Sequence, residues 1–153
     1  MNCFDTLVSR QDMIQTAFLE HIYLSFIAVA IGIAIALPTG ILIARYRRFA
    51  EPIIAVTAIF QTIPSLALFG FLVPLLGIGS PTALIALIIY ALLPILRNTY
   101  TGITGVDGSV IEAGRGMGMT RTQILRQIEL PLALPFIMAG IRTATVLTVG
   151  IAT

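Results

Sequence analysis

The feature that most constrains this chain is the apolar run from Ile22 to Ala44, which has the length of a helix that spans a bilayer. Three further apolar runs follow, and the four predicted spans cover about residues 22–44, 52–78, 82–97 and 132–153. Only 10% of the residues are charged, whereas a soluble domain usually carries about 25%. If these runs were core helices of a soluble protein, the chain would have too little polar surface to cover them. We therefore predict an all-α integral membrane protein with several spans.

The apolar runs end in different ways. The second run is interrupted at Gln61–Ser65 and closes at the turn Gly77–Pro81, and the third closes at Arg97. A polar loop, residues 98–131, separates the third run from the fourth. The fourth run is still in progress at Thr153 and has no polar flank. We therefore expect that the chain is truncated at its C-terminus and that its last span is incomplete.

The arginines predict how the chain is oriented in the membrane. With three spans before the polar loop, seven of the arginines fall on one side: Arg45, Arg47, Arg48, Arg97, Arg115, Arg121 and Arg126. Arg10 alone falls on the other side. Because basic residues concentrate on the cytoplasmic side, we expect the polar loop inside the cell and the N-terminal segment, residues 1–21, outside it.

The residue types that are missing or rare exclude several functions. The chain has no lysine, and a Walker A phosphate loop requires one. Its single cysteine, Cys3, and its single histidine, His21, allow neither an internal disulfide nor a Cys/His metal site. We therefore expect no enzymatic activity of its own, no cofactor and no bound metal.

The polar loop contains two signals for the start of a helix. Ser109 with Glu112, and Thr120 with Gln123, each have the spacing of a capping box. The glycine-rich stretch Gly116–Met119 lies between them and can form a left-handed turn. In the second helix, Ile124, Leu125 and Ile128 share one side, and Arg121 and Arg126 share the other. These signals predict a helix-turn-helix that Pro131 either ends or joins to the next span.

This pattern is compatible with more than one role. A solvated connector would have the same caps and glycines. A DNA-binding helix-turn-helix is disfavoured because the loop is tethered between spans and no further basic patch accompanies it. We therefore expect no nucleic-acid partner.

The loop resembles the signature of permease subunits of binding-protein-dependent ABC importers. That signature is Glu-Ala-Ala, three residues, Gly, nine residues, Ile, one residue and Leu-Pro. The matching positions here, with every spacing kept, are Glu112, Ala113, Gly114, Gly118, Ile128, Leu130 and Pro131. The one departure is Gly114, which replaces the second alanine. The resemblance implies that these residues form the coupling helix that docks in a groove of an ATPase subunit.

The stretch from Gln61 to Ile103 is similar to the subgroup that imports quaternary amine osmoprotectants such as glycine betaine, choline or carnitine. This resemblance implies a MetI-like fold in the bacterial cytoplasmic membrane, with four of the expected five or more spans present. The implied partners are separate ATPase subunits that hydrolyse ATP, a second permease subunit, an external substrate-binding protein and the lipid bilayer. The alternatives are a permease for another small solute such as an amino acid, a secondary transporter or channel without an ATPase, or a truncated, non-functional permease.

Polar and helix-disturbing residues at membrane depth are candidates for the translocation path, because disrupted helices tend to line protein or a water-filled route. The candidates are Gln61, Thr62, Pro64, Ser65, Tyr90 and Asn98. The alternative is that they hold helices together. A quaternary ammonium prefers aromatic faces, which Phe60, Phe69, Phe71 and Tyr90 offer.

One ionisable residue, Arg142, falls inside the fourth apolar run. A charge at this depth is costly and usually has a purpose. A cationic solute would be repelled by arginine, so we expect a structural or gating role. Its side chain could reach the cytoplasmic face or pair with Glu129 or Glu112.

Overall fold

The computed structural model describes residues 11–152, and these residues form helices and turns with no β-strand. The long helices are α2 (Gln11–Arg45), α5 (Ser80–Thr104) and α8 (Leu130–Ile151). The shorter ones are α3 (Ala50–Thr62), α4 (Ser65–Leu76), α6 (Gly108–Gly116) and α7 (Arg121–Ile124). A 3₁₀ turn, η1 (Arg47–Phe49), precedes α3, and a π turn, η2 (Leu125–Glu129), joins α7 to α8. The predicted all-α fold class is confirmed.

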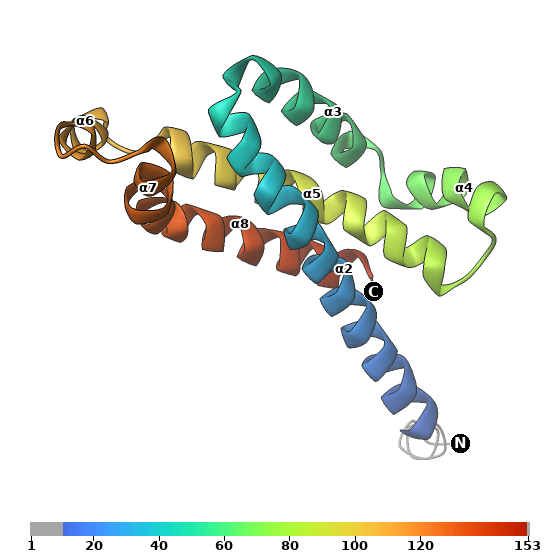
Figure 1. Ribbon diagram of the computed structural model, residues 1–153. Helices are drawn as coiled ribbons and strands as arrows, with labels where there is room; N and C mark the ends of the chain where they lie inside the picture. The colour runs from blue at the N-terminus through green and yellow to red at the C-terminus, as the bar shows by residue number, and fades with distance from the viewer. Residues whose placement is uncertain (1–10, 153) are drawn as a thin grey trace.

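Helix α5 is the centre of the fold. Its most extensive contacts are with α2 and α8, and α3 and α4 pack along it from another side (Figure 1). Helices α6 and α7 extend from one end of this bundle (Figure 1). The main cluster of buried apolar residues accordingly draws on four helices: Ala36, Ile43, Ala50, Ala91, Ile95, Leu96 and Ala144.

Small residues set the close contact between α2 and α5. Gly32, Ala36 and Gly40 recur every fourth residue on the buried face of α2. A Cβ atom added to Gly40 would lie 2.8 Å from the Cβ of Thr99, and one added to Gly32 would lie 3.0 Å from the Cβ of Ala91. In a bilayer, where apolar surface alone does not drive helices together, such close approach is a principal source of association.

The contact between α5 and α8 is equally close. A Cβ atom on Gly140 would lie 2.7 Å from the Cβ of Asn98 and 2.8 Å from the carbonyl oxygen of Pro94. A Cβ atom on Gly102 would lie 2.8 Å from the Cβ of Phe136. The two helices therefore fit backbone against backbone, and neither can slide or rotate alone without a clash.

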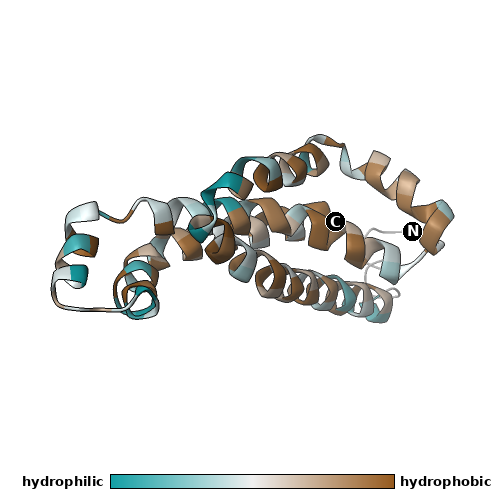
Figure 2. Ribbon diagram, turned by 45° about the horizontal axis from the view of Figure 1, so that its top comes forward, coloured by the Kyte–Doolittle hydropathy of each residue, from teal (hydrophilic) through white to brown (hydrophobic). Residues whose placement is uncertain are grey.

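Three helical stretches are long and apolar enough to cross a membrane: Gln11–Arg45, Ser80–Thr104 and Arg121–Ile151. The pair α3 and α4 counts as a fourth if the two helices, which are bent by 96°, form one broken span. Hydrophobic residues dominate the long helices, whereas hydrophilic ones gather around α6, α7 and the helix ends near them (Figure 2). At 1.5 Å per residue α2 is about 52 Å long, well beyond the hydrocarbon core of about 30 Å.

Several boundaries differ from the sequence prediction. Helix α2 begins at Gln11, inside the segment predicted to lie before the first span, while Cys3 and Arg10 fall outside the described residues. Helix α5 continues past Arg97 to Thr104, so the loop is shorter than predicted. An arginine does not end a helix whose backbone bonds remain intact, and the Arg97 side chain is exposed.

The bend between α3 and α4 has a local cause. Pro64 disfavours the helical conformation of the residue before it, and Ile63 is extended, with φ −71° and ψ 128°. The Ile63 carbonyl thereby loses its helical partner, and the Tyr90 hydroxyl on α5 donates a hydrogen bond to it. Tyr90 therefore fastens the bend to the central helix.

Candidate functional site

The candidate site is the helix-turn-helix segment, residues 108–131, and it begins with a cap that the sequence did not predict. The Asp107 carboxylate accepts a hydrogen bond of 2.9 Å from the backbone N–H of Ser109. The predicted capping box of Ser109 and Glu112 is wrong, because the helix starts one residue before Ser109 and Asp107 caps it. Hydrogen bonds from the Ser109 backbone and side chain lower the pKa of Asp107 below its ordinary value.

Helix α6 ends in the predicted glycine turn. Gly118 has a φ of +78°, a left-handed conformation that glycine adopts without strain. The backbone N–H of Met119 donates to the Gly114 carbonyl at 3.1 Å, and that of Gly118 donates to the Arg115 carbonyl at 2.9 Å. This pair of bonds is the Schellman motif, which satisfies the last carbonyls of a helix.

Helix α7 begins with the predicted capping box. The Gln123 side chain accepts a hydrogen bond from the Thr120 backbone N–H at 2.7 Å, and the Thr120 hydroxyl accepts one from the Gln123 backbone N–H at 3.4 Å. These reciprocal bonds fix the angle at which the chain leaves the turn. The second helix start is therefore confirmed.

A small core holds α6 against α7 and η2. Gly114 and Ile124 are buried, and a Cβ atom on Gly114 would lie 2.7 Å from Cδ1 of Ile128 and 3.3 Å from Sδ of Met119. Two positions of the signature, Gly114 and Ile128, therefore contact each other. An alanine at position 114 would fit only if the flexible end of Ile128 moved aside.

The signature residues divide into two sets. Glu112, Ala113, Gly118 and Pro131 are exposed, whereas Gly114 is buried and Ile128 and Leu130 are half-buried. Leu130 packs against a buried cluster that includes Ile103 of α5 and Ile137 of α8. The buried and half-buried residues build the segment and anchor it to the bundle. The exposed residues on α6 remain accessible.

Helix α7 leads into α8 without a break. The backbone N–H of Leu130 donates to the carbonyl of Leu125, five residues earlier, as in a π turn. Pro131 follows directly, near the start of α8. A proline ring normally clashes with the carbonyl four residues earlier, and the wider π turn gives it room. Of the two predicted roles of Pro131, the structure has the second: it joins α7 to the next long helix.

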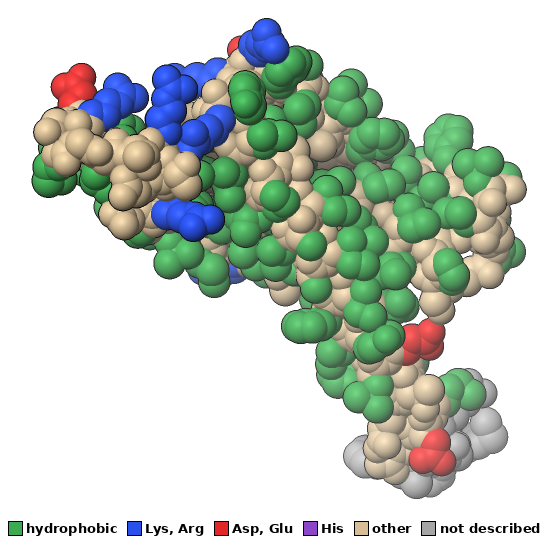
Figure 3. Space-filling view, viewed as in Figure 1, with side chains coloured by type: hydrophobic (Ala, Val, Ile, Leu, Met, Phe, Trp, Pro, Cys, Tyr) green, Lys and Arg blue, Asp and Glu red, His purple; other side chains and the backbone are tan. Residues whose placement is uncertain are grey.

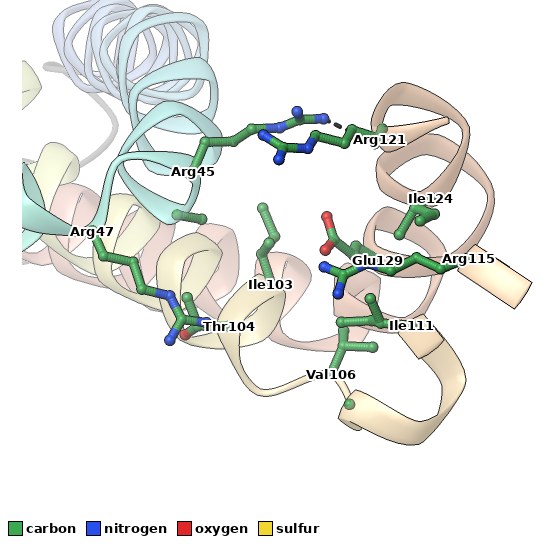
Figure 4. A pocket seen from close by; sticks show the side chains of 12 residues that line it. Arg45, Arg47, Ile103, Thr104, Val106, Ile111, Arg115, Arg121, Ile124 and Glu129 are labelled. Carbon is green, nitrogen blue, oxygen red and sulfur yellow. Dashed lines mark hydrogen bonds between the residues drawn. The ribbon is translucent and has the colours of Figure 1, made fainter. Parts of the chain in front are cut away.

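Four arginines from separate parts of the chain line one cavity of about 320 Å³ beside this segment. They are Arg45 at the end of α2, Arg47 in η1, Arg115 on α6 and Arg121 on α7. Figure 4 shows the side chains of Arg45, Arg115 and Arg121 extending toward the same hollow. Sequence reasoning placed all four on one side of the membrane but could not bring them together, because their proximity depends on the fold.

The predicted path residues fall into two groups. Gln61, Thr62, Pro64 and Ser65 surround the bend, where Tyr90 joins them through its hydrogen bond to Ile63. Asn98 lies about 12 Å further along α5, where its side-chain amide donates to the Pro94 carbonyl at 2.8 Å.

Three of these polar groups are bonded to backbone carbonyls. The Thr62 hydroxyl donates to Ile59 at 2.7 Å, and Tyr90 and Asn98 donate as described. These bonds stabilise helix geometry at membrane depth. A role of these residues along a path remains a prediction.

Arg142 lies on the exposed side of α8, in a groove with Pro135, Met138 and Leu147. Within residues 11–152 no carboxylate lies within salt-bridge distance of its guanidinium group, so the predicted pairing with Glu129 or Glu112 is not formed.

The long helices, the bent α3–α4 pair and the helix-turn-helix continuous with α8 define a multi-pass membrane protein with a projecting helix-turn-helix segment. The family described as binding-protein-dependent transport system inner membrane component matches residues 28–153. The chain belongs to this family, and the resemblance found in its loop is confirmed.

Individual relatives agree with this assignment. The glycine betaine/carnitine/choline transport system permease protein OpuCB of Bacillus subtilis (strain 168) is 51% identical over 88% of this chain and 62% of its own length. The choline transport system permease protein OpuBB of the same organism is 52% identical over the same shares. The carnitine transport permease protein OpuCD of Listeria monocytogenes is 46% identical over 97% of this chain and 70% of its own length.

A solved structure has the same fold. The chain is similar to an inward-facing structure of the MetNI methionine ABC transporter, with 27% identity and a TM-score of 0.75 over 86% of this chain and 68% of that chain. The expected MetI-like fold is confirmed. This chain spans 62% of the length of the first two Bacillus relatives.

Proposed function

We propose that this chain is the membrane-embedded part of an ATP-driven importer and that separate ATPase subunits dock on its helix-turn-helix segment. The observation that carries this proposal is the exposed pair Glu112 and Ala113 on a helix whose other side is fixed by Gly114. A docking site must present accessible side chains on a rigid support. The cap at Asp107, the Schellman turn and the small core supply that support.

The segment can also pass motion into the membrane. Helix α7 is continuous with α8 from Arg121 to Ile151, and α8 touches the backbone of α5 at Gly102 and Gly140. A push on α7 therefore moves α8 and α5 together. In an importer this motion would shift the balance between inward-open and outward-open states, which requires no chemical step in the chain itself.

The solute we propose is a quaternary amine osmoprotectant such as glycine betaine, choline or carnitine, delivered from outside by a binding protein to a pair of permease subunits. The names of the relatives, which are choline, carnitine or glycine betaine transport permeases, support this class. The cationic head of such a solute is attracted to aromatic faces. Near the bend Phe60 and Phe71 are exposed, whereas Tyr90 is only 4% exposed and bonded to the backbone. Phe60 and Phe71 are therefore the better candidates for contact.

The orientation we propose places the helix-turn-helix segment in the cytoplasm of a bacterial cell and the N-terminus outside. Arginine side chains gather over α6, α7 and the adjoining end of the bundle (Figure 3). This one-sided distribution is typical of the cytoplasmic face.

Co-purification with an ATPase subunit tests the docking role. We expect Glu112→Lys to reduce the amount of bound ATPase at least tenfold, because it reverses the charge at the proposed contact. Glu51→Lys is the matched control, since Glu51 is also exposed and lies in the first turn of α3, close to the arginine-rich end. Equal retention by both variants would refute docking at Glu112.

Uptake by proteoliposomes tests the solute. The assay contains the full set of partner subunits and radiolabelled choline, with glycine betaine, carnitine or an amino acid as competitor. Competition by the quaternary amines and none by the amino acid is expected. Uptake that continues without ATP would favour a channel or secondary transporter instead.

A further inference from the structure

The arginine-lined cavity beside the helix-turn-helix segment, defined above by Arg45, Arg47, Arg115 and Arg121, has no role in the proposed import cycle. Glu129 is the one carboxylate among its lining residues. Four positive charges therefore face one negative charge. Among residues 11–152 no carboxylate lies within salt-bridge distance of any of the four guanidinium groups. Like charges gathered in one hollow repel each other unless an anion joins them.

The protein itself uses few of the N–H donors of these four guanidinium groups. Arg45 donates one hydrogen bond, from Nη2 to the carbonyl oxygen of Arg121, at 3.0 Å. In the described part of the chain, Arg47, Arg115 and Arg121 make no side-chain hydrogen bond. The neighbouring Arg48 is turned instead toward the Phe49 ring, 4.5 Å from its centroid. Most of the planar guanidinium donors around the cavity are thus available to a ligand with several oxygen acceptors, and phosphate suits this geometry best.

The place of the cavity in the fold points to the bilayer. Arg45 is the last residue of α2 and Thr104 the last of α5, so the cavity opens where two candidate spans end. Its wall also includes apolar residues, among them Ala44, Ile103 and Ile124. A volume of about 320 Å³ falls within the range of small-ligand sites, about 300–1,000 Å³. Basic pockets at this level between membrane helices are suited to lipid headgroups.

We propose that this cavity binds a phosphate group and that its source is the headgroup of an anionic phospholipid of the surrounding bilayer. Such a headgroup would bridge the end of α2 to α6 and α7, which a single hydrogen bond joins here in the described part of the chain. Occupancy would steady the helix-turn-helix segment against the spans. The inference requires α2 and α5 to be spans and is independent of the solute and of ATPase docking.

The test measures lipid binding by the full chain in detergent micelles. Short-chain phosphatidylglycerol is titrated against short-chain phosphatidylcholine, with native mass spectrometry reporting bound lipid and circular dichroism reporting thermal unfolding. We expect selective binding of phosphatidylglycerol and a rise in the unfolding temperature with its concentration. Equal binding of the two lipids would overturn the proposal.

Arginine variants locate the binding. The double change Arg47→Gln and Arg115→Gln removes two cavity charges without breaking a protein hydrogen bond, and it should weaken binding of phosphatidylglycerol about 25-fold, at about fivefold per charge. Arg97→Gln with Arg126→Gln is the control, because it removes two charges from outside the cavity. Equal weakening by both double variants would show only general attraction and would overturn the site.

Two further experiments complete the test. Inorganic phosphate, titrated alone, distinguishes a lipid headgroup from free phosphate as the ligand. Phosphate binding with the same dependence on the arginines would keep the phosphate site but overturn the lipid as its source. If the double variant fails to fold, the single variant Arg121→Gln replaces it, with a fivefold loss expected and an unchanged affinity as the contrary result. The amount of ATPase that co-purifies with these variants distinguishes a failure of the lipid proposal from a failure of the ATPase-docking proposal.

Discussion

The contact at Gly140 allows a quantitative test of how α8 is held against α5. In Gly140→Ala the new Cβ atom would lie 2.8 Å from the carbonyl oxygen of Pro94, which cannot rotate away, and 2.7 Å from the Cβ of Asn98. An ordinary contact begins near 3.4 Å, so α8 must move by roughly 0.6 Å. Overpacking of this kind costs about 1–3 kcal/mol.

The matched control is Gly70→Ala. Gly70 lies within α4, and a Cβ atom there would meet nothing within 4 Å. Both changes gain the same helix propensity, up to about 1 kcal/mol, so the difference between them isolates the packing term.

Thermal unfolding of the two purified variants in detergent, followed by circular dichroism, measures this difference. At about 2–4 °C per kcal/mol, Gly140→Ala should unfold about 2–12 °C below Gly70→Ala. Truncation of Asn98 to alanine should not rescue the loss, because its Cβ atom and the Pro94 carbonyl both remain. Equal unfolding temperatures would refute the close contact, and with it the rigid link between the two helices.

Three other predictions concern local structure. Tyr90→Phe leaves the carbonyl at the α3–α4 bend without its donor and should destabilise the protein by about 0.5–1.5 kcal/mol, whereas Tyr23→Phe, on the exposed part of α2, should change the unfolding temperature little. Gly118→Ala forces a side chain into the left-handed turn at a cost of about 1 kcal/mol, so trypsin should cleave the segment faster than in Gly116→Ala, whose φ is ordinary; equal cleavage rates would contradict a strained turn. The pKa of Asp107 is lowered in the folded chain, so its cap contributes fully above the ordinary pKa of aspartate and is lost as the pH falls through the lowered value. The protection of α6 amides against hydrogen exchange, relative to an unstructured chain at the same pH, should therefore fall in acid, and Asp107→Asn, which also caps helices, should remove that pH dependence.

Sequence reasoning succeeded where the determining interactions are local. The Thr120 and Gln123 capping box and the turn at Gly118 depend on residues within a few positions of each other, so their spacing was enough. The break near Pro64 was predictable for the same reason. Even so, two caps competed before α6, and Asp107 displaced the Ser109 box, which spacing alone did not reveal.

Sequence reasoning failed where the fold brings distant residues together. The bond from Tyr90 to Ile63 joins residues on different helices, and no periodicity marks it. The contact of Gly114 with Ile128 shows why the signature is spaced as it is, but only once the turn has folded α6 back onto η2. The arginine cavity likewise requires the end of α2 to lie beside α6 and α7.

The π turn between α7 and α8 also acts as a register device. A π turn holds more residues than an α-helical turn, and each residue of an α-helix rotates the chain by about 100°. The wider turn takes up one extra residue, so deletion of Gln127, which is exposed within η2, would let the helix run as uninterrupted α and would turn α6 only slightly around the axis of α8. A residue inserted into the regular α-helical part of α8 has no such turn to absorb it and would swing α6 by about 100°. Glu112 would then face a different direction, although every side chain of the helix-turn-helix segment was unchanged. The direction of that segment is therefore set by chain length as much as by side-chain chemistry.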